Sequence, residues 1–410
     1  MSTLHPATGA RQFFRHFVGY LGDAGYSRAE MLKYVWQPHH PSNLHVLGPQ
    51  RDLDFSKLTV TEQEISDAQE ASFAGDRFVD RAFYSNNKTI IVLVPGFTHE
   101  TLKNLSLHEE VEREDSPHEV LMLSPGAPGE PSQEKLYAQG AGFKLVYARY
   151  PRSNADSAHV VPALFDLLHN SVTLRRWVEE EGYRLFFMGY SYGCPLSLEL
   201  LAGMNSQQFP DEFILKNTQG MLALCGAIGG SYLADDVMRP DSKLMHIPKL
   251  VERCRKYPWL SKLAGMPTRQ FQDDMEGGVR SLTRAVRQQK MAEYASKLPA
   301  NLHYFSVSAV LPLSDYKRRW WQFNLDDYTM WLQAKVSDPI SIYNDGQVVM
   351  TDNLIPHPPH IPAERIVHLG AVRAHHWAVS YKTFNLGKND FPRRAFYKAL
   401  MQTVYDTLNQ

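Results

Sequence analysis

Short, almost wholly apolar runs recur along the chain, separated by longer segments that carry apolar residues at helical spacing. The apolar runs are 89–94, 143–147, 183–188, 220–227, 302–311 and 365–372. Such a run is typical of a central strand in a parallel sheet, because that strand is buried on both faces. Since strands and helices alternate, the pattern predicts an α/β fold with a doubly wound, mostly parallel sheet. Functional groups in such sheets gather beyond the carboxyl ends of the strands.

The segments between these runs differ in character. Residues 156–182 predict a helix behind an aspartate cap, and 391–408 predict an amphipathic closing helix. Residues 81–85 predict a strand that turns through an Asn-Asn-Lys sequence into the next strand. Residues 232–300 are charged and rich in methionine, without any strand-like run, which predicts a helical insertion. The stretch 320–331, with its Trp-Trp-Gln-Phe and Tyr-Thr-Met-Trp sequences, is predicted to be irregular.

The sequence Gly-Tyr-Ser-Tyr-Gly at 189–193 lies between the apolar run 183–188 and a helix predicted to start at Pro195. A tight turn from strand to helix forces its central residue into a strained conformation and leaves little room two residues to either side, where glycines fit. Ser191 is then expected to stand above the sheet edge, near a helix amino end that favours negative charge. G-x-S-x-G alone is common by chance, but in this context it favours a nucleophilic serine.

A serine nucleophile needs donors for the oxyanion that forms on its substrate. The loop after the strand 89–94 reads Pro-Gly-Phe-Thr (95–98), and a loop with a glycine there can aim the backbone N–H of Phe97 at that oxyanion. The backbone N–H of Tyr192 faces the same oxygen. Phe97 and Tyr192 are therefore the predicted oxyanion donors, and the alternative is an ordinary Pro-Gly turn at the end of a strand.

The base is expected after the last predicted strand, where His375 and His376 are neighbours. His376 is favoured because an apolar, small, apolar run follows it, and His375 is its rival. His368, inside the strand, is interpreted as a structural histidine. The acid that orients the imidazole is expected at or beyond the end of the penultimate strand. From the residues alone, two candidates remain: Asp315, directly after that strand, and Asp345, in an Asn-Asp-Gly sequence that is also ordinary turn chemistry.

Four segments in this order resemble the landmarks of the α/β-hydrolase superfamily, and within it the lipase and carboxylesterase branch. They are VLVPGF (92–97), MGYSYG (188–193), NDGQVV (344–349) and HHWAVS (375–380). A weaker similarity is found in LCGAIGGSYLADD (224–236), which resembles the lipase segment that leads into a lid. The order serine, aspartate, histidine agrees with this superfamily. In lipase-like members the acid commonly lies in an Asp-Gly-x-Val turn, so the resemblance favours Asp345 over Asp315. Many relatives have His-Gly where this chain has Pro95-Gly96, a departure that leaves a backbone donor in place.

The resemblance covers roughly residues 81–410 and implies an α/β-hydrolase core at 81–231 and 301–410, with a helical lid or cap at 232–300. Residues 1–80 lie outside it, and their aromatic-rich helical stretches predict an N-terminal prelude packed on the core. The methionines of the insertion and Trp259 either line an adaptable apolar site or only pack the lid on the core. These methionines are Met238, Met245, Met266, Met275 and Met291.

The resemblance further implies a serine hydrolase that cleaves carboxylic esters of apolar acyl groups. Ser191, His376 and Asp345 would form the catalytic triad and Ser191 the acyl-enzyme, without a cofactor or metal. The expected partner is a small-molecule or lipid-like ester. Two alternatives remain open: a thioesterase or acyltransferase with the same triad, and a binding protein that keeps the fold without the reaction. A metal-dependent hydrolase using His357 and His360 is disfavoured, because their intervening prolines suit a ligand helix poorly and no carboxylate follows at ligand spacing.

The amino-acid composition further narrows the kinds of protein that this chain can be. The 410 residues are 43% hydrophobic and 21% charged, as expected of a soluble globular protein. A net charge of -1 gives no indication that the protein binds nucleic acid or an anionic membrane. The three cysteines form no CxxC pair, which suits a reducing compartment and excludes a zinc framework. The chain shows no secretory signal pattern and no apolar run of about 18 residues, so we expect no transmembrane segment and a cytoplasmic location. The sequence does not predict the oligomeric state.

Overall fold

The computed structural model describes residues 6–36, 61–73, 88–97, 144–148, 154–210, 212–242, 244, 246–257, 269–316, 325–380 and 391–409. The strand predicted at 81–85 lies outside these residues, as do Thr98, Met245, Trp259 and Met266.

Among the described residues, seven strands form one sheet in the order β1-β7-β6-β5-β4-β2-β3. Their bounds are β1 Val35–Trp36, β2 Thr89–Val94, β3 Lys144–Tyr147, β4 Arg184–Tyr190, β5 Thr218–Leu224, β6 His303–Val310 and β7 Ile366–Arg373. All neighbouring pairs are parallel except β1 and β7, which are antiparallel. The predicted doubly wound, mostly parallel sheet is thus confirmed.

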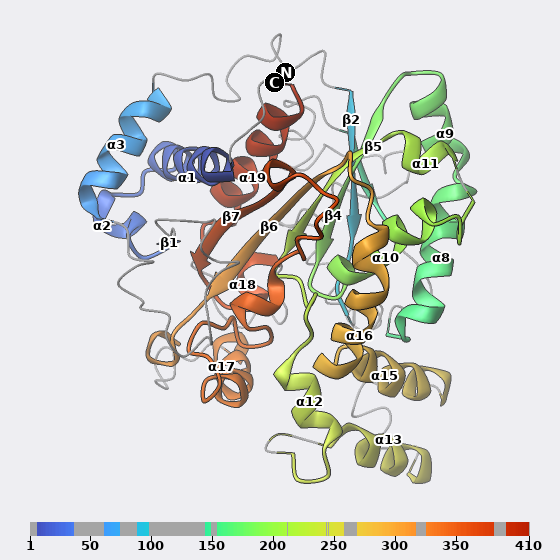
Figure 1. Ribbon diagram of the computed structural model, residues 1–410. Coiled ribbons are helices and arrows are strands. Elements are labelled where there is room, and N and C mark those ends of the chain that lie inside the picture. Colours follow the sequence, from blue (N-terminus) through green and yellow to red (C-terminus); the bar gives the residue numbers. More distant parts are fainter. Residues whose placement is uncertain are drawn as a thin grey trace, which may run out of the picture.

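Helices cover both faces of the sheet (Figure 1). Their bounds are α1 Pro6–Asp23, α2 Arg28–Met31, α3 Glu62–Phe73, α8 Ser157–His169, α9 Val172–Glu179, α10 Gly193–Asn205, α11 Glu212–Lys216, α12 Tyr232–Met238, α13 Ile247–Lys256, α15 Arg269–Ser281, α16 Arg284–Tyr294, α17 Leu325–Ser337, α18 His376–Ser380 and α19 Arg393–Leu408. Alternate residues of each strand enter two different cores, because side chains along a strand point to opposite faces. In β2, Ile91 and Leu93 belong to the same core as the apolar residues of α1 and α19, whereas Ile90 and Val92 belong to the core that includes residues of α8 and α10.

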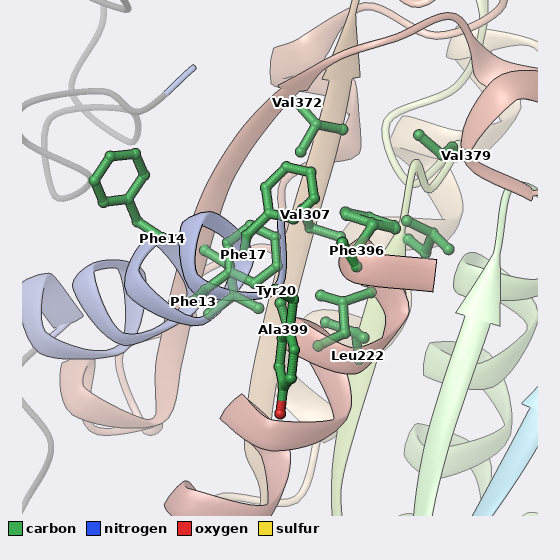
Figure 2. Close-up of a cluster of buried hydrophobic side chains, with 14 of the residues drawn as sticks. Phe13, Phe14, Phe17, Tyr20, Leu222, Val307, Val372, Val379, Phe396 and Ala399 are labelled. Carbon is green, nitrogen blue, oxygen red and sulfur yellow. The ribbon is translucent and has the colours of Figure 1, made fainter. Parts of the chain in front are cut away.

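The N-terminal helix α1 contributes to the first of these cores. Figure 2 shows Phe13 and Phe17 of α1 beside Phe396 and Ala399 of α19. The ring of Phe396 meets those of Phe13 and Phe17 edge-on, with centres 6.0 and 5.8 Å apart. Edge-to-face contacts of this kind stabilise a core beyond the burial of their area. The same N-terminal region supplies β1, which pairs with β7 at the edge of the sheet.

Several predicted elements differ from those observed. The helix predicted over 156–182 is two helices, α8 and α9, because the side chain of Ser171 accepts the N–H of Leu174 and starts a second helix. The predicted cap is confirmed, since Asp156 accepts the N–H of His159 at the start of α8. The irregular stretch predicted at 320–331 is wrong for its second half, because 328–331 lie within α17. Its first half, 320–323, lies outside the described residues.

The described part of the segment 232–300 is helical and contains no strand, as predicted. Its last helix, α16, packs on α10: Nη1 of the fully buried Arg287 donates to Oε1 of Glu199 over 2.6 Å. Helices α12, α13 and α15 share a small separate apolar cluster, with Val251 and Cys254 buried at its centre. Met238 and Met275 pack in this cluster, whereas Met291 packs on the core beneath α16. Figure 1 shows α12, α13 and α17 at the end of the molecule toward which the parallel strands run.

None of the helices in the described residues combines the length and the apolar character needed to cross a bilayer.

Candidate active site

Ser191 directly follows β4 and precedes α10, with a backbone φ of 53°. A non-glycine residue in this left-handed region is strained, and such strain persists only where surrounding contacts impose it. Two contacts with the segment after β5 do so: Ser191 N–H donates to the carbonyl of Leu224 over 3.0 Å, and Ala227 N–H donates to the carbonyl of Ser191 over 3.2 Å. The serine is therefore held at the carboxyl end of the sheet in the conformation that the sequence predicted.

The glycines on either side of Ser191 are required by close packing. A Cβ on Gly189 would lie 2.7 Å from Cα of Cys194, and a Cβ on Gly193 would lie 2.1 Å from the carbonyl oxygen of Val94. Neither space admits a side chain, because contacts under 3.0 Å do not occur for real Cβ atoms. The spacing of the two glycines thus lets α10 start directly against the end of β2.

The loop after β2 passes beside the serine. A Cβ on Gly96 would lie 3.0 Å from Cβ of Ser191. The rings of Phe97 and Tyr192 meet at an angle of 69°, with centres 6.0 Å apart. The structure therefore places both predicted oxyanion donors close to Ser191: Tyr192 follows it at the start of α10, and Phe97 follows the glycine that touches it.

His376 and Asp345 are bound to each other. The ring Nδ1 of His376 lies 2.6 Å from Oδ2 of Asp345, and the backbone N–H of His376 donates to the carbonyl of Asp345 over 2.8 Å. The other carboxylate oxygen of Asp345 accepts the N–H groups of Gln347 and Val348, at 2.9 and 2.7 Å. An ionised carboxylate only accepts, so Nδ1 of His376 carries the proton and Nε2 offers a lone pair. Nε2 is buried and has no hydrogen-bond partner among the described residues.

This pair lies next to the serine turn. The imidazole of His376 is 5.0 Å from the ring of Tyr190, centre to centre, and the Tyr190 hydroxyl donates to the carbonyl of His376 over 3.0 Å. Since Tyr190 immediately precedes Ser191, three segments distant in sequence meet at the carboxyl ends of β4, β6 and β7. Tyr190 had no signal of its own in the sequence beyond its place in the G-x-S-x-G turn.

The rival candidates have other partners. Nε2 of His375 lies 2.9 Å from Oδ1 of Asp327 in α17, a residue that sequence reasoning did not single out. Asp315 accepts from the guanidinium of Arg373, with Nε at 2.8 Å and Nη2 also bound. His368 is buried within the sheet, with Nδ1 3.0 Å from Oγ of Ser306.

The side chain of Asp345 is almost completely buried. Burial raises the pKa of the Cys225 thiol well above its usual range, and the negative charge of Asp345 raises it further. Burial likewise raises the pKa of Cys194, the second residue of α10. Both thiols are therefore neutral at physiological pH and act as small apolar side chains. In such an environment electrostatic interactions are stronger than in water.

No group of three histidine, cysteine, aspartate or glutamate side chains that could hold a metal ion occurs within the described ranges. His360, one of the two histidines considered above as metal ligands, has its Nε2 2.8 Å from the carbonyl of Leu298, to which it can only donate.

Known proteins resemble this chain in structure, although no protein-family model and no curated protein matches its sequence. A metagenomic carboxyl esterase aligns with a TM-score of 0.53 and 19% identity, over 79% of this chain and 77% of its own. The mature lipase BlEst2 of Bacillus licheniformis aligns with a TM-score of 0.43 and 13% identity, over 79% of this chain and 92% of its own. Together with the strand order, the similarity to the carboxyl esterase shows that the chain has the α/β-hydrolase fold.

Proposed function

We propose that this α/β-hydrolase-fold protein is a serine hydrolase that cleaves carboxylic esters of apolar acyl groups through a covalent acyl-enzyme. The observation that carries the proposal is the conformation of Ser191, a serine held at a φ of 53° between two glycines that admit no side chain. The bond between His376 and Asp345, beside that turn, supplies the base and the residue that orients it.

In the first half of the reaction, Oγ of Ser191 attacks the ester carbonyl carbon while Nε2 of His376 takes the hydroxyl proton. Asp345 keeps the imidazole in the tautomer with the proton on Nδ1 and stabilises the charged ring. The tetrahedral intermediate collapses, Nε2–H protonates the leaving alkoxide, and the acyl group stays on Ser191. Water, deprotonated by Nε2, then attacks the acyl-enzyme, and the proton returns to Oγ as the carboxylic acid leaves.

The backbone N–H groups of Tyr192 and Phe97 are the proposed donors to the oxyanion. Their placement supports this role, because Tyr192 is the N-cap residue of α10 and Phe97 follows Gly96, where an added Cβ would lie 3.0 Å from Cβ of Ser191. A helix amino end also favours the developing negative charge. One donor of this kind typically lowers the barrier by about 3 kcal/mol.

The helical segment 232–300 is the proposed cap over the acyl group. Two contacts of α15 with the neighbourhood of the serine support this: a Cβ on Gly278 would lie 2.5 Å from the ring of Phe97, and the Tyr192 hydroxyl donates to Oγ of Ser281 over 2.9 Å. Because Arg287 anchors α16 to α10, we expect α16 to stay with the core. Helices α12 and α13, which pack with α15 in a separate apolar cluster, are then the proposed movable part of the cap.

Covalent labelling with a fluorophosphonate probe tests the proposal. The wild type should be labelled and should hydrolyse p-nitrophenyl esters of graded chain length, and Ser191→Ala should lose both. Ser197→Ala is the matched control, because Ser197 is a buried serine of α10 whose hydroxyl donates to the carbonyl of Gly193. Absence of labelling in the folded wild type, with and without detergent, would contradict the proposal. Labelling at Ser191 with turnover of thioesters only would favour a thioesterase.

A further inference from the structure

We propose that Asp327 and His375 are positioning residues through which helix α17 sets the orientation of His376. This inference rests on the proposed function for its kinetic consequences, but its structural content stands on contacts of its own. Asp327 lies in the first turn of α17, and His375 immediately precedes α18, whose first residue is His376.

Both ring nitrogens of His375 are engaged. The backbone N–H of Ala378 donates to Nδ1 over 3.1 Å, so Nδ1 carries no proton. The ring proton is therefore on Nε2, which donates to Oδ1 of Asp327 over 2.9 Å. Accepting from an N–H three residues ahead is the geometry of a helix cap, and here it fixes the first turn of α18. His375 thus defines the backbone from which the side chain of His376 extends.

The two adjacent histidines are consequently in opposite tautomers. His375 carries its proton on Nε2, for Asp327, and His376 carries its proton on Nδ1, for Asp345. Each aspartate selects the tautomer of one ring and holds that ring in place. Because the rings belong to neighbouring residues, displacement of one backbone displaces the other.

The same helix also contacts the turn that carries Asp345. A Cβ on Gly346 would lie 3.1 Å from the carbonyl oxygen of Met330, and the side-chain amides of Gln347 and Gln333 are bonded over 3.0 Å. Helix α17 therefore contacts His375, the residue before the base, through Asp327, and it contacts the turn of Asp345 through Met330 and Gln333. One rigid element thus sets the distance between the two partners of the bond from His376 to Asp345.

Apolar contacts keep α17 in this place. Met330 and Ala334 are buried with Tyr316, and Trp331 packs on the same cluster together with Trp377 of α18. The ring of Tyr316 is nearly parallel to that of His375, at an angle of 16° and a centre distance of 6.1 Å. The bond from Asp327 to His375 adds a polar contact to these apolar ones, and polar contacts specify orientation where apolar contacts tolerate sliding.

Three substitutions test the inference by ester hydrolysis. Asp327→Ala should lower kcat by roughly 10- to 100-fold with little change in KM, because misplacing a catalytic group by about 1 Å costs up to about a hundredfold. Asp327→Asn retains an oxygen that can accept from Nε2–H and should restore kcat to within about threefold of the wild type. Asp315→Ala is the matched control: it breaks the bond to Arg373 at the end of β7 and should lower thermal stability without lowering kcat.

Imidazole nitrogen NMR on ¹⁵N-histidine protein tests the same inference without activity. The signals of the two rings are identified by their loss in His375→Asn and His376→Asn, and should report opposite tautomers in the wild type. In Asp327→Ala, the Nδ1–H signal of His376 should weaken through exchange with water.

Full kcat together with an unchanged His376 signal in Asp327→Ala would overturn the inference. So would an equal loss of kcat in Asp315→Ala, since that outcome indicates general destabilisation. If Ser191→Ala still hydrolyses the ester in the same assay, the proposed function is wrong. The NMR measurement of the two histidine tautomers then tests the inference independently of activity.

Discussion

The hydroxyl of Tyr190 donates a 3.0 Å hydrogen bond to the backbone carbonyl of His376, joining residues 186 positions apart. Tyr190 is the last residue of β4 and His376 the first residue of α18. The bond therefore links the backbone on which Ser191 is mounted to the backbone of the imidazole beside it. Both residues are buried, so water does not replace the bond when it is lost.

Tyr190→Phe should consequently lower kcat by about fivefold, since a typical hydrogen bond contributes about 1 kcal/mol. Tyr304→Phe is the matched control: its buried hydroxyl donates to the carbonyl of Pro299 over 2.9 Å, away from the site. Both variants should lose a similar free energy of unfolding in urea titrations, but only Tyr190→Phe should lose activity. Equal kcat values in the two variants would show that Tyr190 acts on stability alone.

Gly193→Ala should destabilise the fold by about 3 kcal/mol, as overpacking of a filled interior does. The reason is the 2.1 Å approach of its Cβ to the carbonyl of Val94. Gly277→Ala, within α15, is the contrasting change, because the nearest atom outside its helix backbone is 3.8 Å away. We expect that substitution to stabilise the protein by roughly 0.5–1 kcal/mol. Urea titration of both variants measures the difference, and a stable Gly193→Ala protein would refute the steric account.

The contribution of the buried ion pair of Arg287 with Glu199 to stability should depend on the presence of both partners. Burial lowers the pKa of Arg287, but the charge of Glu199, together with Tyr294, Tyr192 and the hydrogen bond to Glu199, more than offsets this, so the pKa of Arg287 is raised and the guanidinium stays charged. Arg287→Met should cost about 3 kcal/mol, because it leaves Glu199 with only the weaker contact to Lys290 at 3.4 Å. Adding Glu199→Leu should recover most of this loss. Thermal unfolding of the single and double variants compares them, and additive losses would contradict this interpretation.

Acid should destabilise the protein partly through His303. Burial, and to a smaller degree the charge of Arg365, lower the pKa of His303 from 6.5 to about 4. Between these values the unfolded chain binds a proton that the folded chain does not, so this contribution to stability is complete above pH 6.5 and declines as the pH falls toward 4. His303→Gln should therefore lose less thermal stability than the wild type between pH 7 and 4.5. Identical slopes for His303→Gln and the wild type would argue against this role.

Much of the sheet and the serine turn could be predicted because their signals are local. A strand buried on both faces needs consecutive apolar residues, so β2, β4 and β6 were visible as runs. The end of β5 was predicted too late, at residue 227 rather than Leu224, because Cys225 leaves the strand with a φ of 48° that its apolar side chain does not reveal. The two residues of β1 are too short for any pattern, and their pairing with β7 depends on the packing of α1.

By itself, the sequence determined which segments form the central strands, the place of Ser191 and the presence of a glycine two residues to either side of it, since each leaves a local pattern of residues. Only the tertiary structure decided which aspartate meets which histidine: Asp345 binds His376, Asp327 binds His375, and Asp315 binds Arg373. Adjacent histidines have nearly the same sequence context, yet their rings face different elements. Their partners lie 31 and 48 residues away, and only the folded arrangement of α17, the Asp345 turn and α18 brings each within hydrogen-bond distance.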